Sequence, residues 1–359
     1  MKDQHLLDYL HTFIDQNDCS DDQFNECALT LFSYQYKNNI PFQKYCLQKG
    51  KTPRTVKTWQ QIPAVPINAF KELTLSCADP ATAERIFMTS GTTQKVQGKH
   101  YHPSLSVYDL SMIRNFKERF IGAHEKIQMG ILFPTEDEMP NSSLAHYLAL
   151  AVRKFGKEDS QYFINGHGLE LYPLMDKMEH VEKTAEPYAL LGASYSFVHL
   201  LDELENMGKV YKLPSGSKIL DTGGFKNKAR EIELNAFYDR LSQYLGVHRK
   251  NCINMYGMTE LSTQFYDDGN DVVPSHKSGP HWIRTRVINP LTGEDVRKGD
   301  QGVLVHCDLA NFNSVSTILT EDIGIETEKG FLLLGRAKGA EAKGCSLTVE
   351  ELFQARKGN

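Results

Sequence analysis

This sequence of 359 residues lacks the features that mark membrane, secreted or nucleic-acid-binding proteins. It has no apolar run of the roughly eighteen residues that a membrane-spanning helix needs. Its first residues, MKDQHLLDYLHTFIDQNDCSDDQF, are polar and acidic, whereas a signal peptide begins basic and continues apolar. The formal net charge of −5 argues against a general electrostatic affinity for nucleic acid or an acidic membrane surface. We therefore expect no membrane span and no nucleic-acid partner.

Paired cysteines are also missing. The seven cysteines are odd in number and scattered, and none forms a C-x-x-C pair, so neither a disulfide framework nor a zinc cluster is expected. A cytoplasmic, reducing location is the expectation that follows. Cys345, next to Gly344 and near Lys343, is a candidate nucleophile if it is partly exposed. The alternative is a small residue tucked into a turn.

Apolar spacing outlines the elements. Hydrophobic residues make up 40% and charged residues 24% of the chain, which is ordinary for a globular protein, and its length favours subdomains. Residues 1–85 are expected to be mainly helical. Beyond them, strands alternate with helices, which predicts an α/β fold with mostly parallel sheets flanked by helices. The predicted strands cover 126–135, 217–225 and the start of 251–267, the helices cover 104–123, 142–156, 196–209 and 227–246, and a small-residue turn covers 190–196. Residues 280–335 alternate short β-rich runs with turn residues and predict a β-rich part.

The stretch FMTSGTTQKVQGKHY, residues 87–101, has the composition of an anion-binding loop. It does not fit the P-loop template, because six residues separate its glycines and Lys99 is followed by His100. Glycines nevertheless let backbone N–H groups turn toward an anion, while hydroxyls add donors and a lysine adds charge. The candidate ligands are Ser90, Gly91, Thr92, Thr93 and either Lys95 or Lys99. The alternative is a solvated turn.

Three further stretches carry candidate site residues. MYGMTE brings Tyr256, which can stack on a base, close to Glu260, which can hold Mg²⁺, at the end of a predicted strand where ligands bind in open α/β sheets. In DTGGF, a pair of glycines allows a flat ring to approach the backbone. In TED and GR, Asp322 and Arg336 can bind ribose hydroxyls or a phosphate. Taken singly, each stretch is also compatible with an ordinary turn or hairpin.

The order of these stretches is more informative than any one of them. TSGTT, GGF, YGMTE, TED, GR and an end in VEEL together resemble the motif series of the acyl-adenylate-forming superfamily, over roughly the last three-quarters of the chain. Within that superfamily the chain most resembles the LuxE-type acyl-protein synthetases, the fatty-acid-activating component of bacterial bioluminescence reductase complexes. Phenylacetate–CoA ligases look like more distant relatives. The most family-specific stretch is GRAKGAEAKGCSLTVEELF, because it carries a cysteine near the end of the chain.

The resemblance implies ATP-dependent activation of a carboxylic acid as acyl-AMP, followed by transfer of the acyl group to a thiol. Its cofactors would be ATP and Mg²⁺, and an acyl-accepting reductase or transferase would be the partner. By the family pattern, Cys345 is the acceptor thiol, Thr259 reaches the α-phosphate and Glu260 holds Mg²⁺. The same pattern assigns the β- and γ-phosphates to Ser90, Gly91, Thr92 and Thr93, and the ribose to Asp322 and Arg336. It assigns the adenine side to Gly223, Gly224, Tyr256 and Gly257. Residues 192–197 would line the acyl pocket.

The sequence also departs from the superfamily pattern. Gln97 stands at the usual position of the loop lysine, so Lys95 or Lys99 is expected to replace it. Only 23 residues follow Arg336, so Lys338, Lys343 or a partner would replace the mobile lysine of a full C-terminal domain. We accordingly expect an adenylate-forming domain over 1–335 and a short tail over 336–359. Two alternatives remain open: a small-molecule acceptor such as CoA or an amine, and a subunit that binds nucleotide without catalysis.

Overall fold

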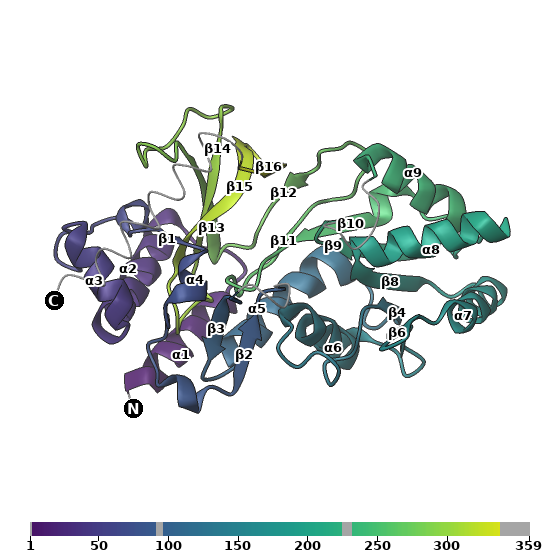
Figure 1. Ribbon diagram of the computed structural model, residues 1–359, viewed down its shortest axis with the longest axis horizontal. Coiled ribbons are helices and arrows are strands. Elements are labelled where there is room, and N and C mark those ends of the chain that lie inside the picture. Colours follow the sequence, from purple (N-terminus) through teal and green to yellow (C-terminus); the bar gives the residue numbers. More distant parts are fainter. Residues whose placement is uncertain (1, 91–95, 225–231, 338–359) are drawn as a thin grey trace. The chain divides into compact units, whose positions relative to one another are not determined.

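The computed structural model describes residues 2–90, 96–224 and 232–337, which belong to two compact units. The first unit comprises Met1–Arg114, Met258–Thr263 and Ser278–Asn359, and the second comprises Asn115–Gly257 and Gln264–Lys277. The segment Met258–Thr263 therefore belongs to the first unit, although the chain before and after it belongs to the second. Figure 1 shows the elements of both units.

The second unit is built on a six-stranded sheet in the order β11-β10-β9-β8-β4-β5. All neighbours from β5 to β10 run parallel, and β11 is antiparallel to β10. The predicted α/β fold with a mostly parallel sheet is thereby confirmed. The strands of this sheet are β4 (Gln128–Leu132), β5 (Gln161–Tyr162), β8 (Tyr188–Ala193), β9 (Lys218–Thr222), β10 (Cys252–Tyr256) and β11 (Phe265–Tyr266). The strands of this unit outside the sheet are β6 (Ile164–Asn165), β7 (Gly168–Leu169) and β12 (His276–Lys277).

Helices α7, α8 and α9 share one hydrophobic core with this sheet. Leu190 on β8, Leu201 on α8 and Leu241 on α9 are all fully buried in it. Burying each such side chain contributes about 1.5–3 kcal/mol, and this burial fixes where the strands end relative to the helices. Figure 1 shows α8 and α9 side by side. The helical elements of this unit are α6 (Ser143–Phe155), α7 (Leu171–Thr184), α8 (Ser194–Met207), α9 (Leu234–Leu245), the π-helical turn η3 (Lys117–Ile121) and the 3-10 turn η4 (Arg249–Asn251).

One predicted element is wrong. The sequence predicts a turn at 190–196, but the residues up to Ala193 belong to β8, and α8 begins at the next residue. The small residues serve close packing between strands, since a Cβ on Gly192 would lie 2.5 Å from the carbonyl oxygen of Leu132 on β4. The helix predicted over 227–246 is present from Leu234, and residues 225–231 lie outside the described part.

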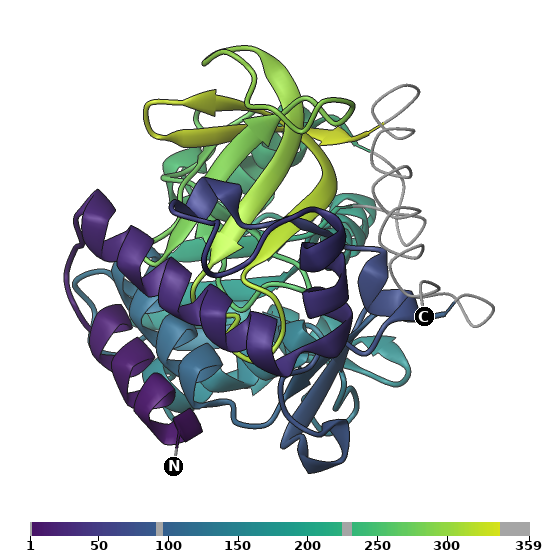
Figure 2. The same cartoon turned by 90° about the vertical axis from the view of Figure 1, so that its left-hand side faces the viewer.

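The first unit combines N-terminal helices with an antiparallel sheet, as Figure 2 shows for the purple helices and the green and yellow strands. The sheet runs β16-β15-β14-β13, with the short β1 parallel to β15, so the β-rich character expected for 280–335 is present. Its strands are β1 (Val65–Pro66), β13 (Ile283–Ile288), β14 (Gln301–Asp308), β15 (Thr317–Thr327) and β16 (Gly330–Arg336); a separate antiparallel hairpin consists of β2 (Arg85–Met88) and β3 (Lys99–His102). The helical elements are α1 (Lys2–Ile14), α2 (Asp21–Asn38), α3 (Ile40–Gln48), α4 (Ala69–Glu72), η1 (Trp59–Gln61), η2 (Pro80–Thr82) and α5 (Ser106–Phe116), whose last two residues belong to the second unit.

Helix α2 holds the loop that follows β14. Ser20 starts the helix with a capping box, in which its hydroxyl accepts from the Gln23 amide and the Gln23 side chain accepts from the Ser20 amide. Further along, the buried Gln35 side chain donates to the carbonyl of Asn311 at 2.6 Å and accepts from the amide of Ser316 at 2.9 Å. These bonds fix the loop, which also contacts residues of the candidate active site described in the next subsection. Among the described residues, no helix is long and apolar enough to cross a membrane.

Candidate active site

The β2–β3 hairpin carries the candidate phosphate loop, and hydrogen bonds close the base of that loop. The amide of Thr89 donates to the carbonyl of Gly98 at 3.0 Å, and the amide of Gly98 donates to the hydroxyl of Thr89 at 2.9 Å. Gly98 suits this close approach, since a Cβ there would lie 3.1 Å from the Thr89 methyl. Ser90 and Lys99 are exposed where the chain leaves and rejoins the hairpin. Gln97, at the usual lysine position, donates its side chain to the Thr89 carbonyl at 2.9 Å and so belongs to the loop base.

The segment Met258–Thr263 is held by buried polar groups of the first unit. The carbonyl of Thr259 lies 2.9 Å from Nδ1 of His100, and the carbonyl of Glu260 accepts from the Asn311 side chain at 2.7 Å. At the other end, the Asp308 carboxylate accepts from the amides of Ser262 and Thr263 at 2.9 and 2.8 Å. The backbone around Thr259 and Glu260 is therefore fixed by side chains from distant parts of the chain.

Glu260 is buried, with 6% of its surface exposed, and burial raises the pKa of its carboxyl to about 7. The positive charges of Arg336 and Lys71 lower this pKa, and the negative charge of Asp322 raises it. A buried carboxylate is costly unless a cation or hydrogen-bond donors compensate it. A bound cation would therefore stabilise the ionised form of the Glu260 carboxyl.

Asp322 and Arg336 lie opposite each other on β15 and β16. Nε of Arg336 is 3.3 Å from a carboxylate oxygen of Asp322, and another nitrogen of the guanidinium is 3.1 Å from the carboxylate of Glu321. Arg336 follows Asp322 by fourteen positions in the sequence, and the antiparallel pairing brings the two together, as their candidate role requires. Both act electrostatically on Glu260, so these three candidate residues share one region of the first unit.

The residues predicted to border the adenine lie in the second unit. Thr222 pairs with Met255 on the neighbouring parallel strand, so Gly223 and Tyr256 leave β9 and β10 at the same level of the carboxyl edge. Gly223 has a φ of +79°, in the left-handed region that favours glycine, and both Gly223 and Gly224 are exposed. Tyr256 is 8% exposed, and its ring lies 5.9 Å from the ring of Phe265. Gly257 follows it and is exposed.

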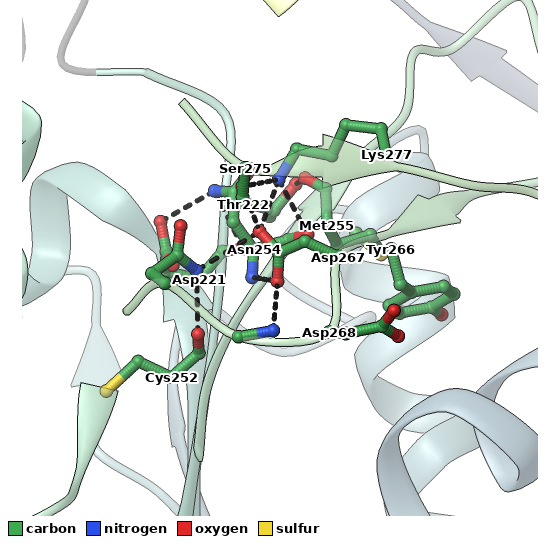
Figure 3. Close-up of polar contacts among 12 residues, drawn as sticks. Asp221, Thr222, Cys252, Asn254, Met255, Tyr266, Asp267, Asp268, Ser275 and Lys277 are labelled. Carbon is green, nitrogen blue, oxygen red and sulfur yellow. Dashed lines mark hydrogen bonds and ion pairs between the residues drawn. The ribbon is translucent and has the colours of Figure 1, made fainter. Parts of the chain in front are cut away.

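A buried polar network lies behind this edge (Figure 3). The Asp221 carboxylate accepts from the hydroxyl of Ser194 at 2.7 Å and from the side chain of Asn254 at 2.9 Å, and so joins the ends of β8, β9 and β10. The amide of Asn254 in turn donates to Asp267 at 3.0 Å. Lys277 completes the network with an ion pair of 2.6 Å to Asp267. These contacts brace the strand ends from which Gly223 and Tyr256 emerge.

The network contains more negative than positive charge, and this affects Asp221. Burial raises the pKa of its carboxyl to about 6, while the bonds from Ser194 and Asn254 and the charge of Lys277 lower it. Burial also lowers the pKa of Lys277, an effect opposed by its pairing with Asp267. The cluster is therefore well hydrogen-bonded. Near neutral pH, however, the ionised Asp221 carboxylate lowers the stability of the folded protein.

Comparisons with known proteins identify the family and the fold of this chain. The family model for "Acyl-protein synthetase, LuxE" matches residues 10–354. The chain belongs to this family. It is 22% identical over 337 residues to the long-chain-fatty-acid–luciferin-component ligase of Vibrio harveyi, covering 90% of this chain and 86% of that protein. It is also 22% identical over 335 residues to the protein of that name from Aliivibrio fischeri, with the same coverage.

Solved structures of adenylate-forming enzymes have the same fold as this LuxE-family chain. One is 2-hydroxyisobutyryl-CoA ligase in an open conformation with 2-HIB-AMP and CoA, with a TM-score of 0.64 and 12% identity over 88% of this chain and 74% of that one. The same ligase in its thioesterification state gives a TM-score of 0.63 with 14% identity, covering 88% of this chain and 68% of that one. The predicted fold class, and the resemblance to LuxE-type acyl-protein synthetases, are confirmed.

Several predicted site residues of this LuxE-family protein lie outside the described part of the chain. They are Gly91, Thr92, Thr93, Lys95 and Cys345, together with Lys338 and Lys343 as possible replacements for the mobile lysine. The family match extends to residue 354 and so includes Cys345. The roles of all these residues, like those of the described site residues, stay predictions.

The other cysteines can be judged from their surroundings. Cys27, Cys46, Cys252 and Cys307 are buried, and burial raises the pKa of each thiol, to about 12 for Cys27 and Cys307. Burial also raises the pKa of the partly exposed Cys19. A thiol must ionise to act as a nucleophile, so these five positions are poorly suited to accept an acyl group at neutral pH.

Sequence reasoning missed the residues that hold the site in place. His100, Asp308 and Asn311 fix Met258–Thr263, while Asp221 and Lys277 brace the adenine side. Their partners lie far away in the sequence or in irregular segments, so no local periodicity marks them. The one available signal was position: Asp221 directly precedes the Thr-Gly-Gly turn, and His100 follows the phosphate loop.

Proposed function

We propose that this protein activates a carboxylic acid of the fatty-acid class with ATP and transfers the acyl group to its own Cys345. Membership of the LuxE family carries the proposal, since that family is one of acyl-protein synthetases. The names of the two curated relatives, both long-chain-fatty-acid ligases, support the class of acid. The acyl group would then pass to a reductase or transferase partner.

The first step forms an acyl adenylate. An oxygen of the substrate carboxylate attacks the α-phosphorus of ATP, the bond to the β-phosphate oxygen breaks, and pyrophosphate leaves. This turns a poor electrophile into a mixed anhydride. Negative charge gathers around phosphorus in the transition state, so donors and cations fixed in advance lower the barrier.

The described residues suit this step in three places. The closed base of the β2–β3 hairpin supports Ser90, Gly91, Thr92 and Thr93 as the clamp for the β- and γ-phosphates, with Lys95 or Lys99 adding positive charge. Thr259, half-buried on a rigid backbone, would reach the α-phosphate. The exposed glycine turn and Tyr256 would border the adenine.

The ribose and the metal would be bound next to each other in the first unit. Asp322 would accept hydrogen bonds from the ribose hydroxyls, with Arg336 assisting. Glu260 would hold Mg²⁺, whose charge would offset the negative charge of the phosphates. A single buried carboxylate fits this role, because protein Mg²⁺ sites commonly use one or two carboxylates together with substrate phosphates. Within the described residues, no larger cluster of metal-ligating side chains is present.

The second step transfers the acyl group to sulfur. The thiolate of Cys345 attacks the acyl carbon, AMP leaves, and a thioester forms on the protein. A thioester remains reactive enough for later reduction or transfer, which is consistent with delivery to a partner enzyme. The six described cysteines are present as thiols, which supports a reducing cytoplasm as the place of action.

Intact-protein mass spectrometry after incubation with ATP, Mg²⁺ and a panel of carboxylic acids tests the proposal. We expect a mass gain specific to one class of acid, removed by hydroxylamine and absent in Cys345→Ser. Cys27→Ser is the control, since its buried thiol should leave the acylation intact. The same reactions should release pyrophosphate in both variants.

Two other outcomes would contradict parts of the proposal. Pyrophosphate release without a mass gain would keep the adenylate but move the acceptor to a small molecule such as CoA or an amine. Neither signal, with and without a cell extract that supplies the reductase or transferase partner, would favour a subunit that binds nucleotide without catalysis.

A further inference from the structure

His100 links the phosphate-loop hairpin to the Thr259–Glu260 backbone. It lies on β3, two residues after Gly98, and its Nδ1 is 2.9 Å from the carbonyl oxygen of Thr259. A carbonyl oxygen can only accept, so Nδ1 must carry the proton and donate it. The ring is 1% exposed, so this bond is shielded from water.

Packing fixes the orientation of the His100 ring. The ring lies 4.2 Å from the ring of His102 and 5.8 Å from that of Phe70, and its backbone pairs with Phe87 across the hairpin. A donor held in this way acts on the Thr259 carbonyl with little freedom to move. The bond therefore transmits the position of the hairpin to the Thr259 backbone.

The other anchors of Met258–Thr263 come from a different part of the unit. Asn311 lies in the loop that follows β14 and holds the carbonyl of Glu260. Asp308 is the last residue of β14 and holds the amides of Ser262 and Thr263. Of these three anchors, His100 is the one that belongs to the hairpin. It thus joins the two segments that both have to meet the phosphates of one ATP molecule.

We propose that His100 is a positioning residue for adenylation, which keeps Thr259 and Glu260 in register with the phosphate loop through its bond to the Thr259 carbonyl. This inference rests on the proposed function. It assigns His100 no contact with substrate and no proton transfer. Its role is to fix the relative placement of groups that stabilise charge at phosphorus, where small displacements cost rate.

The test compares four variants in acid-dependent ATP–pyrophosphate exchange. His100→Leu removes the donor, His100→Asn places an amide N–H near the former Nδ1, and His100→Gln places its amide farther out. His102→Leu is the matched control, a neighbouring buried imidazole on the same strand whose ring packs against Phe87 at 4.9 Å. Thermal unfolding of each variant is measured alongside.

We expect His100→Leu to lower kcat for exchange about tenfold, as loss of one hydrogen bond of about 1–1.5 kcal/mol predicts, with the KM for the acid unchanged. His100→Asn should recover most of the loss and His100→Gln little of it. His102→Leu alters the packing on the His100 ring but keeps the donor, so it should lose clearly less exchange than His100→Leu. If His100→Leu does not fold, the difference between Asn and Gln carries the test.

The outcomes separate the two proposals. No exchange in the wild-type protein would overturn the proposed function itself. Normal wild-type exchange with equal losses in His100→Leu and His102→Leu, or with Asn and Gln equally active, would overturn the role of His100 and leave the adenylation intact.

Discussion

Nζ of Lys277 lies 2.6 Å from a carboxylate oxygen of Asp267, and the two side chains are 5% and 0% exposed. The same carboxylate accepts from the hydroxyl of Ser275 at 2.7 Å and from the amide of Asn254 at 3.0 Å. The ion pair thus joins Lys277, the last residue of β12, to Asp267, which follows β11 and also holds Asn254 on β10. Its burial makes it sensitive to the loss of either partner.

Asp267→Asn should therefore be strongly destabilising. It leaves Lys277 buried without the carboxylate that it directly contacts, and breaking a buried pair in this way typically costs about 3–5 kcal/mol. Asp268→Asn is the matched control, because Asp268 is the next residue and pairs with Arg119 at 2.7 Å, yet its side chain is 85% exposed. That change should cost below about 1 kcal/mol. Chemical denaturation of both variants measures the free energy of unfolding. Equal decreases would mean that the buried ion pair contributes no more to stability than the exposed one.

Asp221 makes stability depend on pH in a defined direction. Its folded-state pKa is raised to about 6, above the ordinary value of 3.8, so the folded protein binds the proton more tightly than the unfolded chain. The resulting stabilisation is fully present below pH 3.8 and is lost as the pH rises through about 6. Between pH 4 and 7 the wild type should therefore lose stability relative to Asp221→Asn.

Denaturation of the wild type and Asp221→Asn across that pH range measures this difference directly. The substitution also alters hydrogen bonds with Ser194 and Asn254, which shifts stability by an amount that does not vary with pH. Only the pH-dependent part reports the carboxyl group. A difference between the two proteins that stays constant, or that runs the other way, would contradict the raised pKa.

The sequence predicts the strands and helices of this fold where local periodicity is strong. The apolar run before Pro134 and the amphipathic stretch ending at Gly156 are present as β4 and α6. All five residues of β4 are buried, and so are most apolar side chains of α6. The turn expected at 190–196 is wrong. Small residues such as Gly192 indicate either a turn or close strand packing, and only the approach of Leu132 decides between them.

Candidate site residues can be selected from the sequence where their chemistry lies in contiguous motifs. Asp322 and Arg336 were chosen from TED and GR, and the antiparallel pairing brings them together. The supporting residues were not predictable, since the bond from His100 to Thr259 spans 159 residues of sequence. Such contacts depend on tertiary packing, which leaves no periodic trace in one sequence.

Gly223 offers a test of the adenine side. Its φ of +79° is unfavourable for a residue with a Cβ, although nothing lies within 4 Å of the place a Cβ would take. Gly223→Ala should therefore cost about 1–2 kcal/mol through backbone strain, and should raise the KM for ATP by displacing the turn. Gly224→Ala adds the same methyl group to the same turn with equal space and no positive φ, so it separates backbone strain from the bulk of the methyl group. Exchange kinetics and thermal unfolding check both, and an unchanged KM in Gly223→Ala would contradict a role for this turn in nucleotide binding.

The ribose role of Asp322 can be separated from its charge by comparing two nucleotides. If Asp322 accepts from the ribose hydroxyls, the wild type should bind ATP more tightly than 2′,3′-dideoxy-ATP, and Asp322→Asn should lose about tenfold or more in ATP affinity together with that preference. Glu321→Gln removes the neighbouring carboxylate, which also contacts Arg336 at 3.1 Å, so it reproduces the change in charge without removing the proposed acceptor. Dissociation constants from titration calorimetry measure each combination. A preference for ATP that survives in Asp322→Asn, or that disappears equally in Glu321→Gln, would mean that Asp322 serves to orient Arg336 and that another group binds the ribose.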